Sequence, residues 1–166
     1  SGERGDYSEN DLPDAKDPYG IAKLLGEVGC TNEITIRTSI IGHDSINKHG
    51  LLEWFLVQEE CRLYTKAIFS GFPTTTLAQV ILDEILPRPK LSGIYHLATR
   101  PISKYELLKL VAKIYKTSTK IIPDCSVVKN LSLNADKFKF ATGYVPPEWP
   151  DLIESMYSYK FGLAGA

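Results

Sequence analysis

Two side chains near the start of the sequence, Tyr19 and Lys23, have types and a spacing that suit proton transfer. Residues four apart on a helix lie one turn apart on the same face, so a phenol and an ammonium would stand side by side. A free phenol titrates near pH ~10, and a neighbouring positive charge favours its ionised form. At about 4 Å and an effective dielectric constant of about 20 the attraction is roughly 4 kcal/mol, against about 1.4 kcal/mol for each pKa unit. The pair therefore suits general acid–base catalysis near neutral pH.

The same spacing recurs at Tyr105 and Lys109, where it predicts an ordinary contact on a helix surface, so the spacing alone is a weak signal. Only the first pair has a longer pattern around it, Tyr-Gly-x-Ala-Lys-x-x-Gly-Glu over residues 19–27. This pattern resembles the active-site helix of the extended short-chain dehydrogenase/reductase family. Tyr105 lacks these neighbours, and we interpret it as structural.

A helix over residues 17–29 must hold the first pair. Pro18 suits its first turn, where a missing N–H costs nothing. Leu24, Leu25 and Val28 then supply an apolar stripe at helical spacing.

A strand must follow this helix and carry the next polar residues. Residues 33–42 are rich in β-branched side chains and end in glycine, which predicts a buried strand of about seven residues. A helix joined to a strand by a short loop is one step of a doubly wound parallel sheet. Ligands of such sheets bind beyond the carboxyl ends of the strands, which brings Thr38, Ser39 and Ile40 to the site. The Ser39 hydroxyl is equally consistent with an ordinary hydrogen bond at a strand end.

The rest of the chain continues this alternation. We expect helix 51–61, a short strand and turn over 62–76, helix 77–86, strand 92–98, helix 103–114, strand 120–123, loop 124–133 and a final helix 151–161. Thr74–Thr76 are predicted to cap helix 77–86, Ser103 to open a capping box with Glu106, and Asn134 to cap a short element over 133–138. His96, in mid-strand among apolar residues, is predicted to be buried and hydrogen-bonded rather than catalytic.

Two further segments resemble the dTDP-4-dehydrorhamnose reductase branch of the family: the strand end Arg-Thr-Ser at 37–39 and the run Gly-Ile-Tyr-His-Leu at 93–97. The resemblance is collinear from residue 1 to about 159. It implies an α/β fold, namely the C-terminal part of a doubly wound Rossmann-like sheet plus a small α/β substrate-binding domain. Residues 1–45 would be the remnant of the NAD(P)-binding domain, and residues 46–166 the substrate-binding domain.

The resemblance also assigns roles. Tyr19 would donate a proton to the carbonyl oxygen of a 4-keto nucleotide sugar while NADH or NADPH delivers hydride to its carbon. Lys23 would lower the pKa of the Tyr19 phenol and hydrogen-bond the nicotinamide ribose. Ser39 would contact the cofactor. The implied substrate-binding residues are Ile40, Gly50, Leu51, Pro73 and Thr74. In the related reductases the position of Ile40 is typically a tryptophan that packs on the sugar.

Two other functions share the pattern. A nucleotide-sugar epimerase or dehydratase uses the same Tyr–Lys pair, although a dehydratase also needs acidic partners. A non-catalytic binding subunit, such as the regulatory subunit of methionine adenosyltransferase, resembles the same reductases. Retention of both Tyr19 and Lys23 favours an enzyme.

The nucleotide-binding half of such an enzyme is not expected in this chain. No Gly-x-Gly-x-x-Gly or Gly-x-x-Gly-x-x-Gly run follows a predicted strand, and residues 1–16 resemble the loop just before the catalytic tyrosine. The chain would then begin in mid-domain, so we expect neither tight dinucleotide binding nor turnover from these 166 residues alone. Missing parallel strands should leave an exposed sheet edge, which predicts a homodimer, a strand-exchanged oligomer or a rearranged N-terminal segment.

Composition argues against several other function classes. The net charge is −1 without a basic stripe, so no nucleic-acid partner is expected, and no apolar run approaches the ~20 residues that cross a membrane. The cysteines at 30, 61 and 125 fit neither a disulfide framework nor a zinc site and predict reduced, mostly buried thiols in a cytoplasmic protein. The three histidines lack metal-ligand spacing, so no metal is expected.

Overall fold

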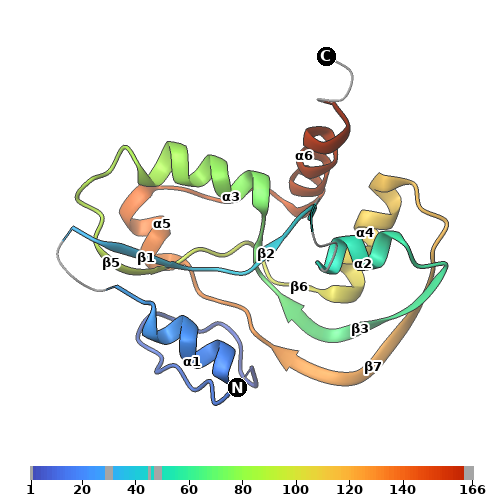
Figure 1. Cartoon of the computed structure of the whole chain (residues 1–166), viewed down its shortest axis with the longest axis horizontal. Helices are drawn as coiled ribbons and strands as arrows, with labels where there is room; N and C mark the ends of the chain where they lie inside the picture. The colour runs from blue at the N-terminus through green and yellow to red at the C-terminus, as the bar shows by residue number, and fades with distance from the viewer. Residues whose placement is uncertain (1, 29–31, 45, 47–49, 163–166) are drawn as a thin grey trace.

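The computed structural model describes residues 2–28, 32–44, 46 and 50–162 (Figure 1). In chain order, the helices and strands of this described part are α1 (Pro18–Leu25), β1 (Ile34–Arg37), β2 (Ile40–Ile41), α2 (Leu51–Leu56), β3 (Glu60–Phe69), β4 (Phe72–Pro73), α3 (Thr74–Val80), the π-helical turn η1 (Ile81–Ile85), β5 (Gly93–His96), β6 (Ile102–Ser103), α4 (Lys104–Tyr115), β7 (Lys120–Asn130), α5 (Asp136–Thr142) and α6 (Trp149–Gly162). The mixed α/β architecture predicted from the sequence is confirmed.

The strands pair in three small sheets. β1 is parallel to β5, with Arg37 opposite His96. β2 is parallel to β4, and the third sheet has the order β6-β3-β7, in which β7 is parallel and β6 antiparallel to β3. The predicted strand 33–42 is interrupted at Thr38 and Ser39, because its two halves pair with different strands.

Two apolar cores hold these sheets and their helices together. The first, beside β5, is built from the buried side chains of Phe72, Val80, Tyr95, Leu97 and Phe138. The second lies among α2, β3, α4 and α6, and includes Leu52, Phe55, Leu63, Leu107, Leu108, Val111, Leu152 and Ile153 (right in Figure 1). Helix α2 ends at Leu56, short of the predicted end at residue 61, because residues 60 and 61 already belong to β3. Both α2 and α4 contribute buried residues to the second core.

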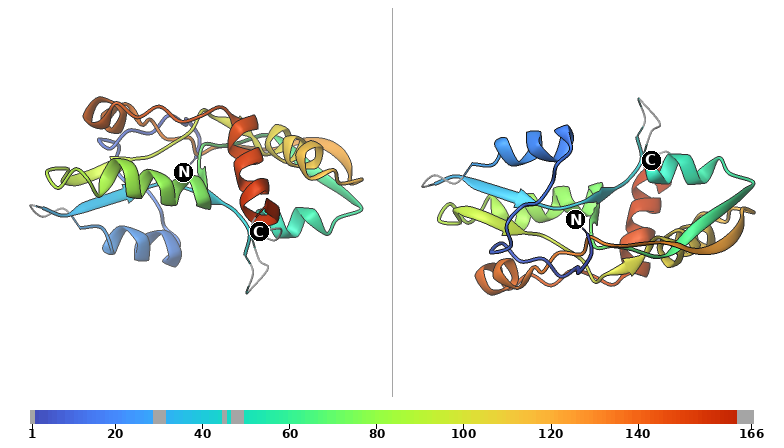
Figure 2. Two further views of the ribbon diagram at one scale, coloured as in Figure 1. Left: turned by 90° about the horizontal axis from the view of Figure 1, so that it is seen from above. Right: turned by 90° about the horizontal axis from the view of Figure 1, so that it is seen from below.

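Helix α1 lies outside both cores. None of its eight residues is buried, and its predicted apolar stripe is exposed, Leu25 to 81%. Asp17 caps the helix by accepting a hydrogen bond from the Gly20 N–H at 2.9 Å. In Figure 1, α1 and α3 lie on opposite sides of the β1–β5 pair, and both views of Figure 2 show α1 beside β1. Because α1 has no fully buried residue, polar contacts must contribute to holding it in place.

The described part of the chain supplies a partner strand for only one edge of β1, the edge that faces β5. The N-terminal segment runs beside residues 130–134, where the Tyr7 N–H donates to the Ser132 carbonyl at 3.0 Å. Among the described residues, the exposed sheet edge expected from the sequence is therefore present at β1.

Several local predictions are wrong. β7 continues to Asn130, well past residue 123, because parallel pairing with β3 carries the strand on through a bulge. Helix α3 begins at Thr74, so Thr74–Thr76 occupy its first turn, and the N-cap position belongs to Pro73. At α5 the N-cap is Ala135, and the Asn134 side chain instead accepts a hydrogen bond from the Asp136 N–H at 2.9 Å.

Other local predictions have mixed outcomes. Ser103 caps α4, because its hydroxyl accepts a hydrogen bond from the Glu106 N–H at 3.1 Å. Cys61 is buried as predicted, whereas Cys125 on β7 is exposed. Cys30 lies outside the described residues.

Candidate active site

Tyr19 and Lys23 lie one turn apart on α1, with the Lys23 Nζ 5.4 Å from the centroid of the Tyr19 ring. The Tyr19 side chain is 74% exposed, so a bound molecule can reach it. Lys109 and Tyr105 on α4 show the same 5.4 Å separation, but Tyr105 packs against the second core. The two pairs therefore share one internal geometry and differ in what surrounds them.

A cleft of about 670 Å³ opens beside α1, and we call it the α1 cleft. Tyr19 and Lys23 line it from the helix. Thr38, Ser39 and Ile40 line it from the carboxyl end of β1 and the start of β2. The structure thus brings Tyr19, Lys23 and Ser39, the three residues predicted to contact a cofactor, to one cleft at a strand end.

The backbone at Ser39 is held by the neighbouring β4 segment. Its carbonyl accepts a hydrogen bond from the Phe72 N–H at 2.8 Å. A Cβ atom on Gly71 would collide with the Ser39 backbone, so only glycine permits this close approach. Gly71 therefore helps to set the position of Ser39 in the α1 cleft.

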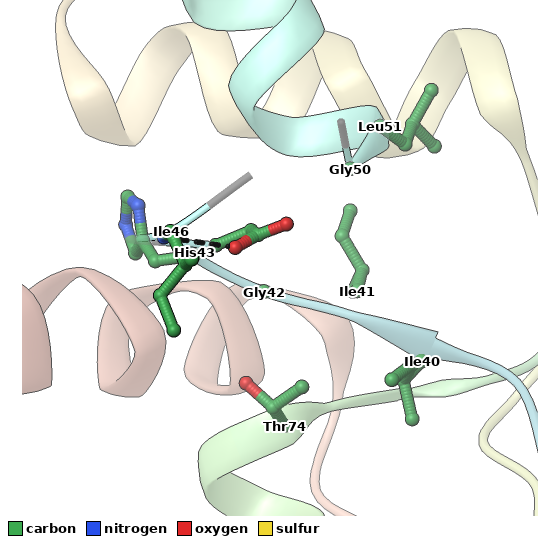
Figure 3. Close-up of a pocket in the computed structure, with 9 residues that line it drawn as sticks. Ile40, Ile41, Gly42, His43, Ile46, Gly50, Leu51 and Thr74 are labelled. Carbon is green, nitrogen blue, oxygen red and sulfur yellow. Dashed lines mark hydrogen bonds between the residues drawn. The ribbon is translucent and has the colours of Figure 1, made fainter. Parts of the chain in front are cut away.

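A second pocket of about 470 Å³ lies next to the cleft, and we call it the α2 pocket (Figure 3). Gly50 and Leu51 line it from the start of α2, and Thr74 lines it from the start of α3. Ile40, which is 59% exposed, lines both this pocket and the α1 cleft. Pro73 is buried on β4 and does not line the pocket. Four of the five residues predicted to bind substrate therefore share one pocket, which meets the Tyr19–Lys23 cleft at Ile40.

His43 fixes one wall of the α2 pocket. Its Nδ1 lies 2.8 Å from the Glu53 Oε1 on α2, and its Nε2 lies 2.9 Å from the Tyr115 hydroxyl on α4. Burial raises the pKa of Tyr115, which keeps that hydroxyl protonated and able to donate to Nε2. When Nε2 accepts that hydrogen bond, Nδ1 carries the ring proton and donates it to Glu53. Sequence reasoning missed this group, because Tyr115 follows His43 by 72 residues and only the fold brings them together.

Arg37 and His96 form a second polar group, which lines the α1 cleft. The Arg37 Nε lies 2.6 Å from Glu27 Oε1 and its Nη2 2.7 Å from Oε2. This paired hydrogen bond lowers the pKa of Glu27 and raises the pKa of Arg37. The Arg37 Nη1 is also 3.3 Å from the His96 Nε2. His96 is 1% exposed and its Nδ1 donates to the Tyr7 carbonyl at 2.9 Å, so the prediction of a buried, hydrogen-bonded histidine is confirmed.

Within the described ranges, no group of three or more His, Cys, Asp or Glu side chains could hold a metal ion. No helix in the same ranges has the length and apolar character that a membrane span requires.

The parallel β1–β5 pair, its flanking helices and the cleft at the strand end define a Rossmann-like α/β fold. No protein-family model matches the chain, and no curated protein matches it significantly. Solved structures do match. The dTDP-4-dehydrorhamnose reductase of Bacillus anthracis in complex with NADP aligns with a TM-score of 0.76 and 18% identity, over 95% of this chain and 61% of that one.

Two further solved structures show the same fold. The dTDP-4-dehydrorhamnose reductase of Clostridium acetobutylicum aligns with a TM-score of 0.75 and 17% identity, over 96% of this chain and 61% of that one. The dTDP-glucose 4,6-dehydratase of Bacillus anthracis in complex with NAD aligns with a TM-score of 0.69 and 13% identity, over 98% of this chain and 58% of that one. The chain therefore shares the fold of these nucleotide-sugar enzymes and spans about 60% of their length.

Proposed function

We propose that the chain is the catalytic and substrate-binding part of an NAD(P)H-dependent nucleotide-sugar reductase that reduces a 4-keto sugar. The observation that carries this proposal is the position of Ile40, which lines both the α1 cleft and the α2 pocket. A sugar held in the α2 pocket would extend past Ile40 toward Tyr19 and Lys23. The reductases that share the fold support this choice of substrate class.

In this proposal a nicotinamide cofactor supplies hydride to the carbonyl carbon of the sugar. Tyr19 places its phenolic O–H at the carbonyl oxygen and transfers the proton as the carbonyl becomes an alcohol. The Lys23 ammonium stabilises the phenolate that remains and donates hydrogen bonds to the ribose of the cofactor. Ser39, at the strand end, adds a hydroxyl to the same cofactor contacts.

The residues of the α1 cleft fit only one end of such a cofactor. A phenol, an ammonium and an exposed serine suit the nicotinamide ribose. The part of the chain that the structure describes has no glycine-rich turn after a strand to hold the pyrophosphate. We therefore propose that the 166-residue chain alone binds dinucleotide weakly and does not turn over. A calorimetric titration with NADPH that gives micromolar affinity would contradict this.

We also propose that two regions of the chain have different functions. Residues 1–45 would serve the cofactor side, and residues 46–166 would form the substrate-binding domain with segments that return to the main sheet. The second apolar core supports this division, because apart from Ile41 its buried members all follow residue 50. A cytoplasmic location, also a proposal, suits the free thiols of Cys61 and Cys125.

The test joins this chain behind the part of the Bacillus anthracis reductase that it does not cover, so that the chimaera carries a nucleotide-binding half. We expect the chimaera to oxidise NADPH in the presence of a dTDP-4-keto sugar and to yield the corresponding alcohol. A panel of dTDP- and UDP-linked 4-keto sugars identifies the nucleotide and the sugar. A chimaera that binds both NADPH and sugar without any oxidation of NADPH would contradict the reductase proposal and favour a binding subunit.

A nucleotide-sugar dehydratase or epimerase is the second candidate, because a dTDP-glucose 4,6-dehydratase shares the fold over nearly the whole chain. Product analysis separates the three reactions. A reductase consumes one NADPH for each sugar reduced, a dehydratase releases water without net consumption of cofactor, and an epimerase inverts one centre of the sugar.

A further inference from the structure

We infer that Arg37 and His96 form a cross-strand anchor that holds both ends of the segment carrying Tyr19 and Lys23. The two anchor residues are register partners on the parallel strands β1 and β5. Their side chains meet, with the Arg37 Nη1 3.3 Å from the His96 Nε2. The segment that contains α1 begins near Tyr7, its near end, and finishes near Glu27, its far end. His96 bonds the near end and Arg37 bonds the far end.

Arg37 holds the far end of this segment. Two of its three guanidinium nitrogens, Nε and Nη2, donate to the two carboxylate oxygens of Glu27, at 2.6 and 2.7 Å. The pair is well covered, with 20% of the Arg37 side chain and 18% of the Glu27 side chain exposed. A further tie lies just beyond, where the Val28 N–H donates to the Thr35 hydroxyl at 3.0 Å. Because α1 buries no residue, these polar contacts fix where the helix ends.

His96 holds the near end. Its Nδ1 donates to the Tyr7 carbonyl at 2.9 Å, and its backbone N–H donates to the Glu9 carboxylate at 2.7 Å. Since Nδ1 carries a proton, the neutral ring leaves Nε2 free of hydrogen and able to accept from Arg37. The same buried ring therefore binds the chain that leads into α1 and the arginine that holds its exit.

The anchor sets the distance between the helix and the strand end. Arg37 is two residues before Ser39, so any shift of α1 relative to Arg37 also moves Tyr19 and Lys23 relative to Ser39 across the α1 cleft. Arg37 and His96 are thus positioning residues, and neither needs to touch a substrate. Only the catalytic consequence rests on the proposed function, because the attachment of α1 is a property of the chain itself.

Hydrogen–deuterium exchange of the 166-residue chain tests the far end. Glu27→Gln and Arg37→Gln remove the ion pair, and we expect the α1 amides to exchange about tenfold faster while those of β3 keep their rate. Arg88→Gln is the control, because it breaks the somewhat more exposed Arg88–Glu84 ion pair away from α1. Unchanged α1 exchange in Glu27→Gln would overturn the inference, and this variant alters only the edge of the molecule, so it leaves both cores intact.

Two more variants test the near end and the pairing. Glu9→Ala removes the contact with the His96 N–H, and we expect faster exchange of the α1 amides here as well. The reversed pair Glu27→Arg with Arg37→Glu should recover part of the lost protection. If α1 exchange in Glu9→Ala matches the parent chain, the claim that both ends are held is wrong. The readout needs no activity, so failure of the reductase proposal would leave this result standing.

Discussion

The chain contains two Tyr-x-x-x-Lys pairs with the same spacing, and only one of them lines a cleft. Lys23 and Lys109 each stand 5.4 Å from the ring of their tyrosine, as expected for any such pair on a helix. The Tyr105 ring packs against the second core, whereas Tyr19 lines the α1 cleft together with Ser39. What lies opposite each pair, rather than the pair itself, therefore distinguishes the candidate site from an ordinary helix surface.

The carboxyl group of Glu27 should titrate below the usual glutamate range. The hydrogen bonds from Arg37 lower the pKa of Glu27, so the ion pair contributes stability above the ordinary titration range and loses it as the pH falls through the lowered pKa. A pH titration of the Glu27 carboxyl carbon by NMR checks this in the folded chain. In Arg37→Gln we expect the titration to move up into the ordinary range, and an unchanged midpoint would show that Arg37 is not the cause.

The neutral form of His96 should carry its proton on Nδ1. That nitrogen lies 2.9 Å from the Tyr7 carbonyl, which can only accept, while Nε2 faces the Arg37 guanidinium, which can only donate. Nitrogen NMR of the neutral ring should show a protonated Nδ1 and an unprotonated Nε2. The opposite tautomer would remove the near-end contact from the anchor.

At the residue scale, the sequence could predict only what local spacing determines. Tyr19 and Lys23 share a face because both lie on one helix, and His96 is buried because its strand is apolar. The contact of Arg37 with His96 depends on the register of two strands almost sixty residues apart, which no local pattern encodes. The anchor therefore became visible only in the fold.

At the scale of elements, His43 joins the loop after β2 to α2 and α4. It bonds Glu53 at 2.8 Å and the Tyr115 hydroxyl at 2.9 Å, so His43→Ala leaves two largely buried polar groups without this partner. We expect a loss of about 1–3 kcal/mol in the free energy of unfolding, measured by urea denaturation. Arg100→Gln is the control, because the Arg100–Glu148 pair is widely exposed and should cost less than about 0.5 kcal/mol. Equal losses in the two variants would contradict a structural role for His43.

The boundaries that sequence reasoning missed follow from tertiary pairing. Pro123, Asp124 and Ser126 disfavour a strand locally, yet β7 passes through them because β3 supplies a parallel partner. The threonines at 74–76 favour a cap by their side chains, but the helix starts directly after Pro73. Where local preference and packing agree, as in α4 with its Ser103 cap, the prediction is confirmed.

At the scale of the whole molecule, β1 has one edge without a partner strand among the described residues. The Glu33 carbonyl accepts a hydrogen bond from the Gly93 N–H at 2.7 Å, and the Arg37 carbonyl accepts one from the Leu97 N–H, just after β5, at 3.0 Å. Backbone groups alternate along a strand, so those of Ile34 and Ile36 face the opposite edge of β1. An unpaired edge of this kind can pair with another chain, and we propose that two copies pair there, as a homodimer or a strand-exchanged oligomer.

Sedimentation across a hundredfold range of concentration should reveal this self-association. Over the same range we expect the Ile34 and Ile36 amides to gain protection from exchange as the dimer forms. The Ile68 amide of β3 serves as the reference, because Ile68 has a register partner on each side, Ser103 on β6 and Asn130 on β7. A chain that stays monomeric throughout, or a dimer that leaves both isoleucine amides unprotected, would contradict pairing through β1.

The fold class could be predicted from the sequence, but the bounds and pairing of its strands could not. The helix–strand alternation and the resemblance together predicted a Rossmann-like α/β chain, and the solved structures agree over at least 95% of it in the reductase matches reported above. The two cavities that meet at Ile40 could not be foreseen, because they form between elements whose mutual placement depends on long-range packing.

The most direct test of the proposed chemistry compares two tyrosines in the chimaera that carries a nucleotide-binding half. Tyr19→Phe removes the proposed proton donor, and Tyr105→Phe removes a hydroxyl from a pair of the same geometry. We predict that Tyr19→Phe lowers kcat for a 4-keto nucleotide sugar by about 10²- to 10⁴-fold, while Tyr105→Phe changes it by less than about twofold. If both variants reduce the sugar at the rate of the parent chimaera, Tyr19 is not the proton donor and the proposed mechanism is wrong.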